Sequence, residues 1–463
     1  MQSAAELKKH PNLLFILSDQ HRFCDLGCYG NKIVQTPTLD SVAEQGILLE
    51  RMYSNCPLCV PARGTLLTGK YPLRHGALTN DILIRPDTES MADILGRNGY
   101  HCGYVGKWHL GGVPRERCIP PEERLGFDYW RACNCNHAYY NAWYDDGENR
   151  RHTVTGYEPH AQTDLALEFL RQPGEKPWAL FISYGTPHNP YDQVPSETID
   201  CYRAADIPLR ENVQTPVTLS RGLPGGDLNE VKAWTAGYYA HIEELDRQVA
   251  RLLNGLGERR DNTIVVYTSD HGDMLGSQGF KDKQLPYEEA VHIPFILSWG
   301  ERLPPGPRRG LMGLVDVAPT LLGLLGLSYE NMDGQDLRGM LIDPEKSGRE
   351  GIYMAEYVPA HEARLRGSPE WRALRTERWL FAKTPYDACW LLFDMEADPF
   401  QRRNLAEDPA FSGIVRELDG QINAEISRHD ALLPWPEFLR RYGFTDLWNK
   451  SQAYFELPLL DFA

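Results

Sequence analysis

Short, uniformly apolar segments alternate with helix-like segments along this chain, and this alternation limits the fold more than any other feature. The apolar segments are rich in β-branched and aromatic residues, as is typical of strands buried on both faces of a parallel sheet. They are Asn12–Leu17, Gly103–Val105, Trp178–Tyr184, Thr263–Thr268 and Ile293–Trp299. Helices are predicted between them over Thr38–Gln45, Thr88–Asn98 and Glu230–Leu256. We therefore predict an α/β fold with a large, mostly parallel central sheet flanked by helices.

The pattern changes near Ser347, where short alternating segments with turn-like breaks replace the long apolar runs. We expect a small antiparallel sheet over residues 371–393, a helix near 411–429 and an aromatic-rich tail from Pro434. This change predicts two domains, a larger one over residues 1–346 and a smaller C-terminal one over residues 347–463. The tail is expected to pack against the main body, with a subunit contact as the alternative.

Polar side chains follow four of the predicted strands, at the point where each strand ends. They are Asp19-Gln20, Lys107-Trp108-His109, Pro187-His188 and Asp270-His271. In open α/β sheets, ligands bind beyond the carboxyl ends of the strands. Packing of a core gives no reason to place carboxylate, amide, imidazole and ammonium groups at these ends. The sequence therefore predicts one convergent site.

The segment from Cys59 to Gly69 adds a candidate nucleophile to this site. Pro61 has a φ that suits a first helical turn, and Gly69 can end the helix. An anion held at Cys59 would meet unpaired helix N–H groups, the positive end of the helix dipole and Arg63 one turn away. The alternative is a structural cysteine near a turn, with Cys56 and Cys59 as a chance C-x-x-C pair.

Asp19, Gln20, Asp270 and His271 are the best candidates for metal ligands. Two carboxylates and an amide oxygen suit a hard cation such as calcium or magnesium, and an imidazole is compatible with calcium or manganese. Each of these residues, taken alone, is more typical of a helix cap or a turn than of a metal site. Two acid-led pairs at two strand ends favour a metal.

Net charge and apolar patterning exclude several classes of protein. A formal charge of −16 argues against nucleic acid as a partner, because phosphate contacts need a basic surface. No membrane span is expected, because the longest apolar window, Leu311–Leu327, is broken by Asp316 and Pro319. Since Leu13–Leu17 is too short for a secretory signal after the polar residues 1–11, we expect a cytoplasmic protein. A periplasmic or secreted protein from which a signal peptide has been removed would look the same.

Most of the chain resembles the type I sulfatases of the alkaline-phosphatase-like superfamily. The cysteine segment is similar to the signature in which that cysteine is oxidised to formylglycine, an aldehyde that hydrates to a gem-diol. Further blocks follow in the order found in that family: Pro11–Asp19, Gly106–Gly111, Pro187–Pro190, Ser269–Asp273, Lys283 with Pro286–Glu289, Leu314–Thr320 and Leu392–Pro399. The resemblance implies the alkaline-phosphatase-like sandwich, with the catalytic residues in the larger domain. Gln20 and His271 depart from the aspartate and asparagine of many members, which leaves calcium favoured over manganese or magnesium but not decided.

The resemblance also implies a role for each candidate residue in hydrolysing a sulfate monoester, expected to be that of a carbohydrate or another small alcohol. Cys59, as the hydrated aldehyde, would be the nucleophile and a metal ligand beside Asp19, Gln20, Asp270 and His271. Arg63, Lys107 and Lys283 would bind the sulfate oxygens. His188 would also bind the substrate and protonate the departing alcohol, leaving a sulfoenzyme. His109 would then take a proton from the second hydroxyl and expel sulfate.

The sequence leaves several alternatives open. Asn80 would contact the substrate or a metal-bound water, and the loop from Cys133 to His137 would either stack on a sugar or simply pack. A formylglycine-generating maturation enzyme is an implied partner, and a homo-oligomer is left open. The nearest rival function is a phosphonate monoester or phosphodiester hydrolase, against which Lys107-Trp108-His109 argues, because those enzymes carry uncharged hydroxyl residues there. A non-catalytic binding protein with the same fold is the second rival.

Overall fold

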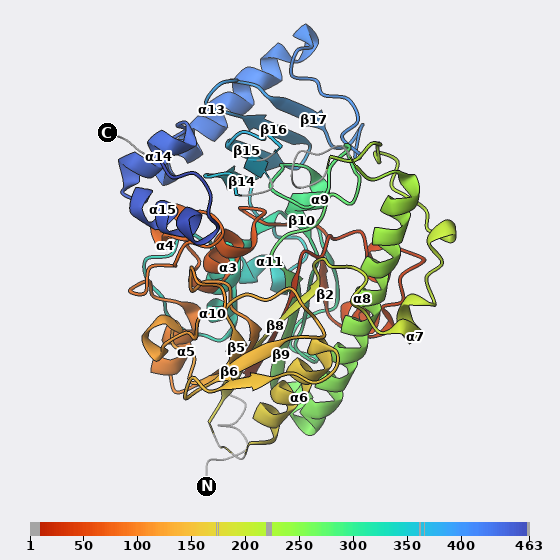
Figure 1. The fold of residues 1–463 in the computed structure, drawn as a ribbon, viewed down its shortest axis with the longest axis vertical. Coiled ribbons are helices and arrows are strands. Elements are labelled where there is room, and N and C mark those ends of the chain that lie inside the picture. Colours follow the sequence, from red (N-terminus) through yellow and green to blue (C-terminus); the bar gives the residue numbers. More distant parts are fainter. Residues whose placement is uncertain are drawn as a thin grey trace.

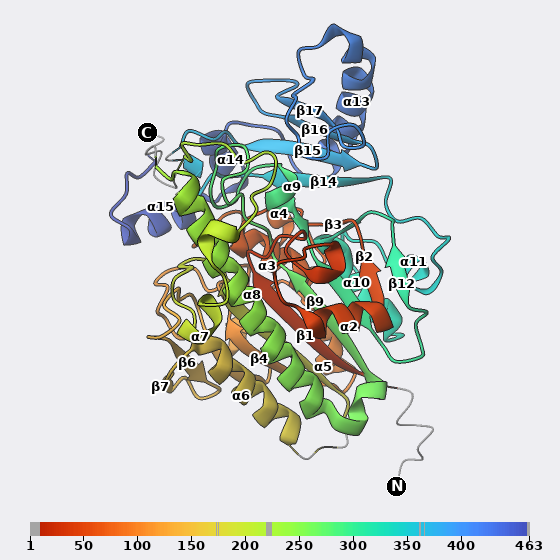
Figure 2. The ribbon, with the colours of Figure 1, turned by 90° about the vertical axis from the view of Figure 1, so that its right-hand side faces the viewer.

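The structure is a computed structural model that describes residues 10–172, 174, 176–218, 225–360, 363–364 and 366–460. Residues 1–9, on which part of the expectation about localisation rests, lie outside the described residues. Figure 1 shows a large body around a central sheet, with a smaller unit at the C-terminal end. The first described residues lie at the opposite end from that unit (Figures 1 and 2).

A ten-stranded sheet forms the centre of the larger body. Its order is β12 (Gly306–Arg308), β2 (Ile47–Leu49), β11 (Phe295–Ser298), β9 (Thr263–Ser269), β1 (Asn12–Asp19), β8 (Trp178–Pro187), β4 (His101–Lys107), β5 (Tyr129–Cys133), β6 (Trp143–Asp146) and β7 (Arg151–Thr153). The five adjacent strands from β9 to β5 are parallel. Their carboxyl ends therefore lie at one edge of the sheet.

Helices cover both faces of this sheet because the central strands are apolar on both sides. Every residue of β1, β8 and β9 is buried. Leu14 and Ile16 of β1 join the core beneath α2 (Pro37–Gln45), α6 (Glu158–Arg171) and α8 (Leu228–Leu256). Leu13, Phe15 and Leu17 face the core formed with α3 (Cys59–Thr68), α5 (Met91–Arg97) and α10 (Val317–Leu324). Figure 2 shows the long α8 running across the first of these faces.

The C-terminal unit is an antiparallel sheet covered by a helix. It runs β14 (Gly351–Glu356), β15 (Trp371–Thr376), β16 (Trp379–Lys383) and β17 (Leu391–Asp394), and α13 (Ser412–His429) packs against β15. The tail forms α14 (Trp435–Tyr442) and α15 (Thr445–Tyr454). Phe438 and Trp448 are buried with Tyr71 and Leu78 of the larger body. The predicted small antiparallel sheet and the packed tail are therefore present, whereas the exact domain boundary stays a prediction.

The strands in the structure differ from the predicted ones in two ways: one predicted strand is divided, and others are additional. Pro294 divides the expected strand Ile293–Trp299 into β10 (His292–Ile293) and β11, because proline has no N–H to donate to a ladder. β10 joins a separate small sheet with β3 (Met52–Tyr53) and β13 (Met312–Gly313), while β11 runs antiparallel to β9. β14 and the shorter strands β2, β3, β5, β6, β7, β12 and β13 were not predicted. Further short α-helices in the described residues are α4 (Pro72–His75), α7 (Ser196–Ile199), α9 (Glu288–Val291) and α11 (Arg338–Ile342).

No helix in the described part of the chain is both long enough and apolar enough to cross a membrane.

Candidate active site

Four strand ends bring the predicted polar residues to one edge of the sheet. Asp19 ends β1 and Lys107 ends β4, while His188 and Asp270 directly follow β8 and β9. The side chains of Asp19, Lys107 and Asp270 are almost completely buried. Because the four strands are parallel neighbours, residues 250 positions apart in sequence meet here. The Gln20 N–H, for example, donates to the Asp270 carboxylate over 3.0 Å.

Cys59 is the first residue of α3, where the chain changes from the extended Leu58 to helix. Its Sγ atom lies 3.1 Å from Nε2 of His271 and 3.8 Å from Oδ1 of Asp19. The side-chain oxygen of Asn80 accepts a hydrogen bond from the Val60 N–H over 3.1 Å, and so satisfies one free donor of the first turn. The contact of Asn80 with substrate stays a prediction.

The helix ends as its sequence predicts. Gly69 adopts a left-handed conformation with φ of 63° and donates its N–H to the Thr65 carbonyl over 2.9 Å. The cysteine thus sits at the positive end of a helix with a fixed start and a fixed end.

Four potential ligand atoms converge beside this helix end. One ligand atom from each of Asp19, Cys59, Asp270 and His271 lies within 4.8 Å of the other three, and all four residues are buried. Two carboxylate oxygens from separate strands, an imidazole nitrogen and the group at position 59 form a donor set that fits a divalent cation. The residues present therefore fit the metal that the sequence predicts.

Gln20 is placed differently from the other predicted ligands. Its side-chain Nε2 donates to the Asp273 carboxylate over 2.6 Å, and its Oε1 accepts a hydrogen bond from the Lys283 ammonium. Its φ of 68° turns the chain sharply after β1. The structure therefore shows Gln20 linking Lys283 to Asp273, and its ligation of a metal stays a prediction.

Arg63 and Lys107 surround the two carboxylates with positive charge. Arg63 donates from Nη2 to Asp19 over 2.8 Å and from Nε to Asp270 over 3.0 Å. The Lys107 ammonium lies 2.7 Å from the same Asp19 oxygen, Oδ2. Burial opposes ionisation of Asp19, but Lys107 and Arg63 outweigh it and hold its pKa well below the ordinary value. The other oxygen, Oδ1, is the one that lies near Cys59.

The same cations act on Cys59 itself. Burial and Asp19 favour the neutral thiol, but Lys283, Lys107 and His271 outweigh them and lower the pKa of Cys59 well below its usual range. A negative charge at position 59 is therefore stabilised by its surroundings. A group that attacks an electrophile, or that receives an anionic group from a substrate, requires this stabilisation.

His109 lies beside the site in a second polar cluster. It follows β4 with a φ of 59°, and neither ring nitrogen has a hydrogen-bond partner among the described residues. Burial opposes a charge on the ring, but the neighbouring Cys135 and Asp81 raise the pKa of His109 to about 10. Burial also opposes ionisation of Cys135, but His109, His137 and Lys107 lower the pKa of that thiol well below its usual range.

The comparison with known proteins agrees with this geometry. The family model described as "Sulfatase" matches residues 11–327, more than half of the chain. The chain belongs to the sulfatase family. The model described as "N-sulphoglucosamine sulphohydrolase, C-terminal" also matches residues 276–428. As a sulfatase, the protein is a sulfuric ester hydrolase, and the family implies a formylglycine and a divalent metal in general.

Similar sulfatases cover nearly the whole chain. An "ulvan-active sulfatase" of Formosa agariphila is 32% identical over 95% of this chain and 86% of its own. An "endo-4-O-sulfatase" of Bacteroides thetaiotaomicron is 30% identical over 94% of this chain and 95% of its own. The solved structure of the protein yidJ from Bacteroides fragilis superposes with a TM-score of 0.80 at 27% identity, covering 93% and 98% of the two chains.

The similarity of this chain to the phosphonate monoester hydrolases concerns the fold alone. The solved phosphonate monoester hydrolase of Agrobacterium radiobacter has a TM-score of 0.72 at 20% identity, covering 90% and 96% of the two chains. The expected class of enzyme, a sulfatase, is therefore confirmed over that rival and over a non-catalytic binding protein. The alkaline-phosphatase-like fold is confirmed as well.

Three residues that the sequence did not single out support the sulfatase site. Ser183 accepts a hydrogen bond from Arg63 over 2.7 Å, Asp273 holds Gln20, and the Asp81 carboxylate faces His109. Asp273 stands inside the recognised block Ser269–Asp273, so its position was a usable signal. Ser183 lies within a buried strand and Asp81 lies in an irregular segment. No sequence pattern therefore marks either residue as part of the site.

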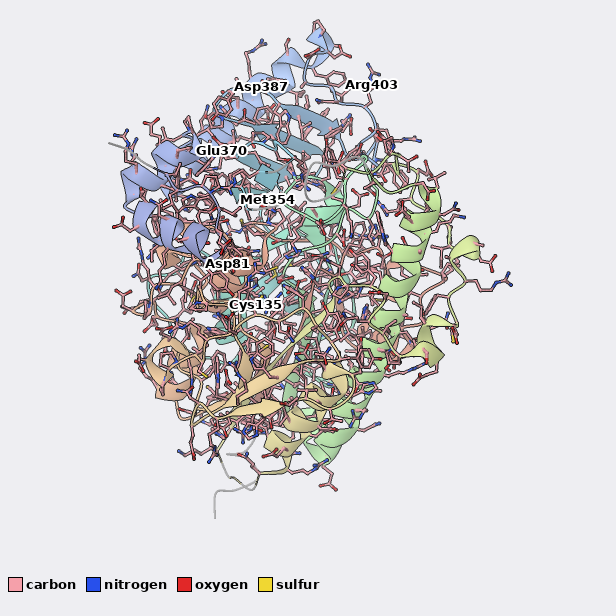
Figure 3. The ribbon with its side chains drawn as sticks, viewed as in Figure 1. Asp81, Cys135, Met354, Glu370, Asp387 and Arg403 are labelled. Atoms are coloured by element: carbon pink, nitrogen blue, oxygen red, sulfur yellow. The ribbon has the colours of Figure 1, made fainter. Side chains whose placement is uncertain are left out.

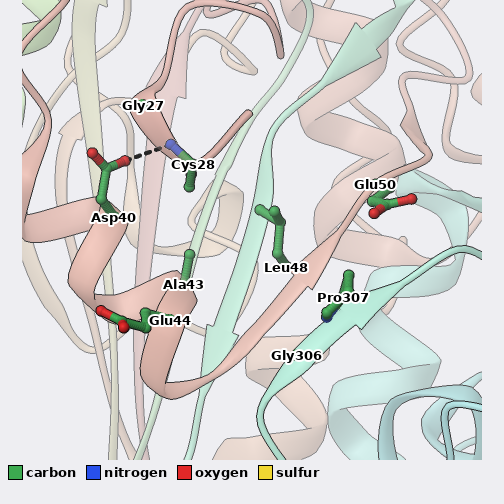
Figure 4. Close-up of a pocket in the computed structure, with 9 residues that line it drawn as sticks. All are labelled: Gly27, Cys28, Asp40, Ala43, Glu44, Leu48, Glu50, Gly306 and Pro307. Carbon is green, nitrogen blue, oxygen red and sulfur yellow. Dashed lines mark hydrogen bonds between the residues drawn. The ribbon is translucent and has the colours of Figure 1, made fainter. Parts of the chain in front are cut away.

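A hollow on another part of the molecule contains none of these residues. A cavity of about 450 Å³ opens between α2, β2 and β12 (Figure 4). Asp40 in its wall accepts a hydrogen bond from the Cys28 N–H over 2.6 Å. Asp40, Glu44 and Glu50 give it an acidic lining, which does not suit an anionic sulfate ester.

All ten cysteines, including Cys56 and Cys59, are free in the structure.

Proposed function

We propose that this sulfatase hydrolyses a sulfate monoester of a carbohydrate, with a formylglycine made from Cys59 and a calcium ion at the site. The named relatives at 30% identity or more act on ulvan or as an endo-4-O-sulfatase, and both cover most of the chain. A carbohydrate is therefore the favoured alcohol.

One observation carries this proposal. Sγ of Cys59, the atom that the aldehyde oxygen would replace, lies at the start of a buried helix, within 4 Å of both Asp19 and His271 and beside the cations of Arg63, Lys107 and Lys283. No other described cysteine shares that set of neighbours. An anion at this point is stabilised by the helix end and by the cations together.

The cation would be held by Asp19, Asp270, His271 and the group at position 59, with Gln20 as a further candidate. Calcium accepts six to eight oxygen ligands in flexible geometries, which suits a pair of carboxylates that arise from different strands. When bound, it would supply Lewis acidity that favours the ionised form of the hydroxyl at position 59.

The chain's own residues bind and orient the ester. Arg63, Lys107 and Lys283 would neutralise the sulfate oxygens, where charge changes as the S–O bond breaks. Nε2 of His188 lies 2.8 Å from Nζ of Lys283, and the ring centres of His188 and His137 are 4.3 Å apart. We expect the departing alcohol to lie beside these residues. His109 would accept the proton whose removal releases sulfate. A maturation enzyme that oxidises Cys59 is the implied partner.

The test is a release assay on defined substrates. Protein co-expressed with a formylglycine-generating enzyme is supplied with calcium and offered sulfated mono- and disaccharides, beside an aryl sulfate and an aryl phosphonate. We expect sulfate release from at least one sugar at a higher kcat/KM than phosphonate cleavage, and loss of that release in Cys59→Ala. Faster phosphonate cleavage, or equal activity in Cys59→Ala, would contradict the proposal.

A further inference from the structure

A buried carboxylate faces His109 from a segment that the proposed chemistry does not otherwise use. Oδ1 of Asp81 lies 3.9 Å from Nε2 of His109, and the side chain of Asp81 is fully shielded from solvent. This distance is longer than a hydrogen bond, but the hydrogen bonds of catalytic groups are often long before the substrate binds and shorten in the complex. Figure 3 shows Asp81 and Cys135, the two anionic neighbours of His109, near the middle of the molecule beneath the C-terminal unit.

Arg115 fixes the orientation of this carboxylate. Its Nε and Nη2 atoms donate to the two oxygens of Asp81, each over 2.7 Å, in a bidentate pair. The guanidinium also lies 4.9 Å from the ring centre of Phe455, directly after α15. Beside it, the Tyr454 hydroxyl donates to Glu116 over 2.7 Å. The C-terminal segment therefore packs on the residue that holds Asp81.

The backbone at this point links the two halves of the site. Asp81 has a φ of 67°, a left-handed conformation that aspartate tolerates better than most residues. The preceding residue, Asn80, caps the helix that begins at Cys59. Two adjacent residues thus contact the nucleophile's helix and the proposed base.

We infer that Asp81, held by Arg115 against the C-terminal segment, is a positioning residue that fixes the tautomer and orientation of His109. This inference rests on the proposed function for the role of His109. A carboxylate accepts only, so it selects the ring form with hydrogen on the nitrogen that faces it and leaves the other nitrogen free to take a proton. It also stabilises the imidazolium that forms. An asparagine of the same shape offers a donor as well as an acceptor and removes both effects.

Other charged or titratable groups around His109 must be held constant in a test. They are Cys135, Lys107 and His137, whose ring centre lies 6.4 Å from that of His109. None of them is changed by a substitution at Asp81 or Arg115, and Asp81→Asn removes one negative charge without removing volume.

The chain offers a matched control in Arg151. It makes a bidentate pair with the buried Asp145 over 2.9 and 3.0 Å and lies 5.0 Å from the ring centre of Trp143. It therefore has the same kinds of contact as Arg115, and it also donates to the carbonyl oxygen of Glu116, the residue after Arg115. Arg151→Ala measures the loss of such a pair at an arginine that binds Asp145 rather than Asp81.

The experiment compares Asp81→Asn, Arg115→Ala and Arg151→Ala by two readouts. The first is kcat for release of sulfate, where we expect Asp81→Asn and Arg115→Ala to lose about tenfold or more while Arg151→Ala stays near the wild type. The second is deuterium exchange at the imidazole C2 atom of His109 across pH, read by mass spectrometry. Here the midpoint should fall in Asp81→Asn, since a carboxylate favours the imidazolium, and stay constant in Arg151→Ala.

Both readouts must move together for the inference to hold. An equal loss of kcat in Asp81→Asn and Arg151→Ala would overturn it, as would a loss of kcat with an unchanged exchange midpoint. If the wild type releases no sulfate, the proposed function fails instead, and the exchange midpoint still decides whether Asp81 acts on His109.

Discussion

Nε2 of His188 accepts a hydrogen bond from the ammonium of Lys283 over 2.8 Å, while its Nδ1 lies 2.7 Å from the Asn189 carbonyl oxygen. A carbonyl oxygen only accepts and an ammonium only donates, so the hydrogen of this ring is on Nδ1. Burial, Lys283 and His137 together lower the pKa of His188 well below its ordinary value. In the proposed reaction, the proton for a departing alcohol would therefore be stored on the His188–Lys283 pair rather than on the imidazole alone.

Replacing His188 tests this pair through the leaving group. We expect His188→Ala to lower kcat on a sugar sulfate by about 100-fold or more, because an alkoxide leaves poorly without a proton. On an aryl sulfate with an acidic phenol the loss should be at least about tenfold smaller, since that leaving group needs little protonation. The ratio of the two kcat values is the measurement. An equal loss on both substrates would assign His188 to binding only.

In the proposed reaction, Cys135 would set the pH at which His109 can act as a base. The thiolate is one cause of the raised pKa of His109, and a base must be neutral to accept a proton, so activity should rise with pH toward that pKa. Cys135→Ser removes the negative charge and should move this rising limb of kcat to lower pH. Cys133→Ser is the control, because burial raises the pKa of Cys133 and keeps it a neutral thiol. A limb that stays in place in Cys135→Ser, or moves equally in both variants, would contradict this account.

The metal site predicts a gain in stability that needs no substrate. A ligand that binds only the folded chain stabilises it by about 2.7 kcal/mol at a hundredfold excess over its Kd. We expect calcium to raise the melting temperature of chelator-treated protein, and Asp19→Asn to remove most of that rise. Manganese and magnesium are compared at the same concentration. An unchanged melting temperature with all three ions would show that the four donors hold no divalent cation.

Gly69 is required at the end of the helix that carries Cys59. A Cβ atom at this position would lie 2.8 Å from the Met332 sulfur, and its φ of 63° already disfavours side chains. We expect Gly69→Ala to lower the free energy of unfolding in urea by about 2 kcal/mol. Gly99 has a φ of 87° with no atom within 4 Å of an added Cβ, so Gly99→Ala measures the backbone effect alone. Equal losses in the two variants would show that crowding against Met332 is unimportant.

The sequence predicted the parts of the structure that depend on local pattern. The strands ending at Asp19 and Ser269 are buried throughout and mostly apolar, and they were predicted to within one or two residues; the cysteine segment forms its helix up to Gly69. β14 was missed because Gly351–Glu356 is short and is stabilised by pairing with β15, a neighbour about twenty residues away. The strand through Ile293 was divided because Pro294 cannot donate to a ladder.

Long-range contacts decide the rest of the site. The side-chain amide of Gln20 could ligate a metal on the basis of its residue type, yet Lys283 and Asp273 hold it in this fold. Asp81 and His109 are 28 positions apart, in segments without regular spacing, so no pattern joins them. Such pairs become visible only when the sheet brings its strand ends together.

The most direct test of the central claim relates activity to the chemical state of residue 59. Preparations with increasing maturation are analysed by mass spectrometry of the peptide that contains Cys59, and sulfate release is measured on each with calcium present. The account predicts that activity rises in proportion to the fraction of aldehyde and is near zero for the unmodified thiol. Full activity in a preparation whose residue 59 is entirely cysteine would contradict it.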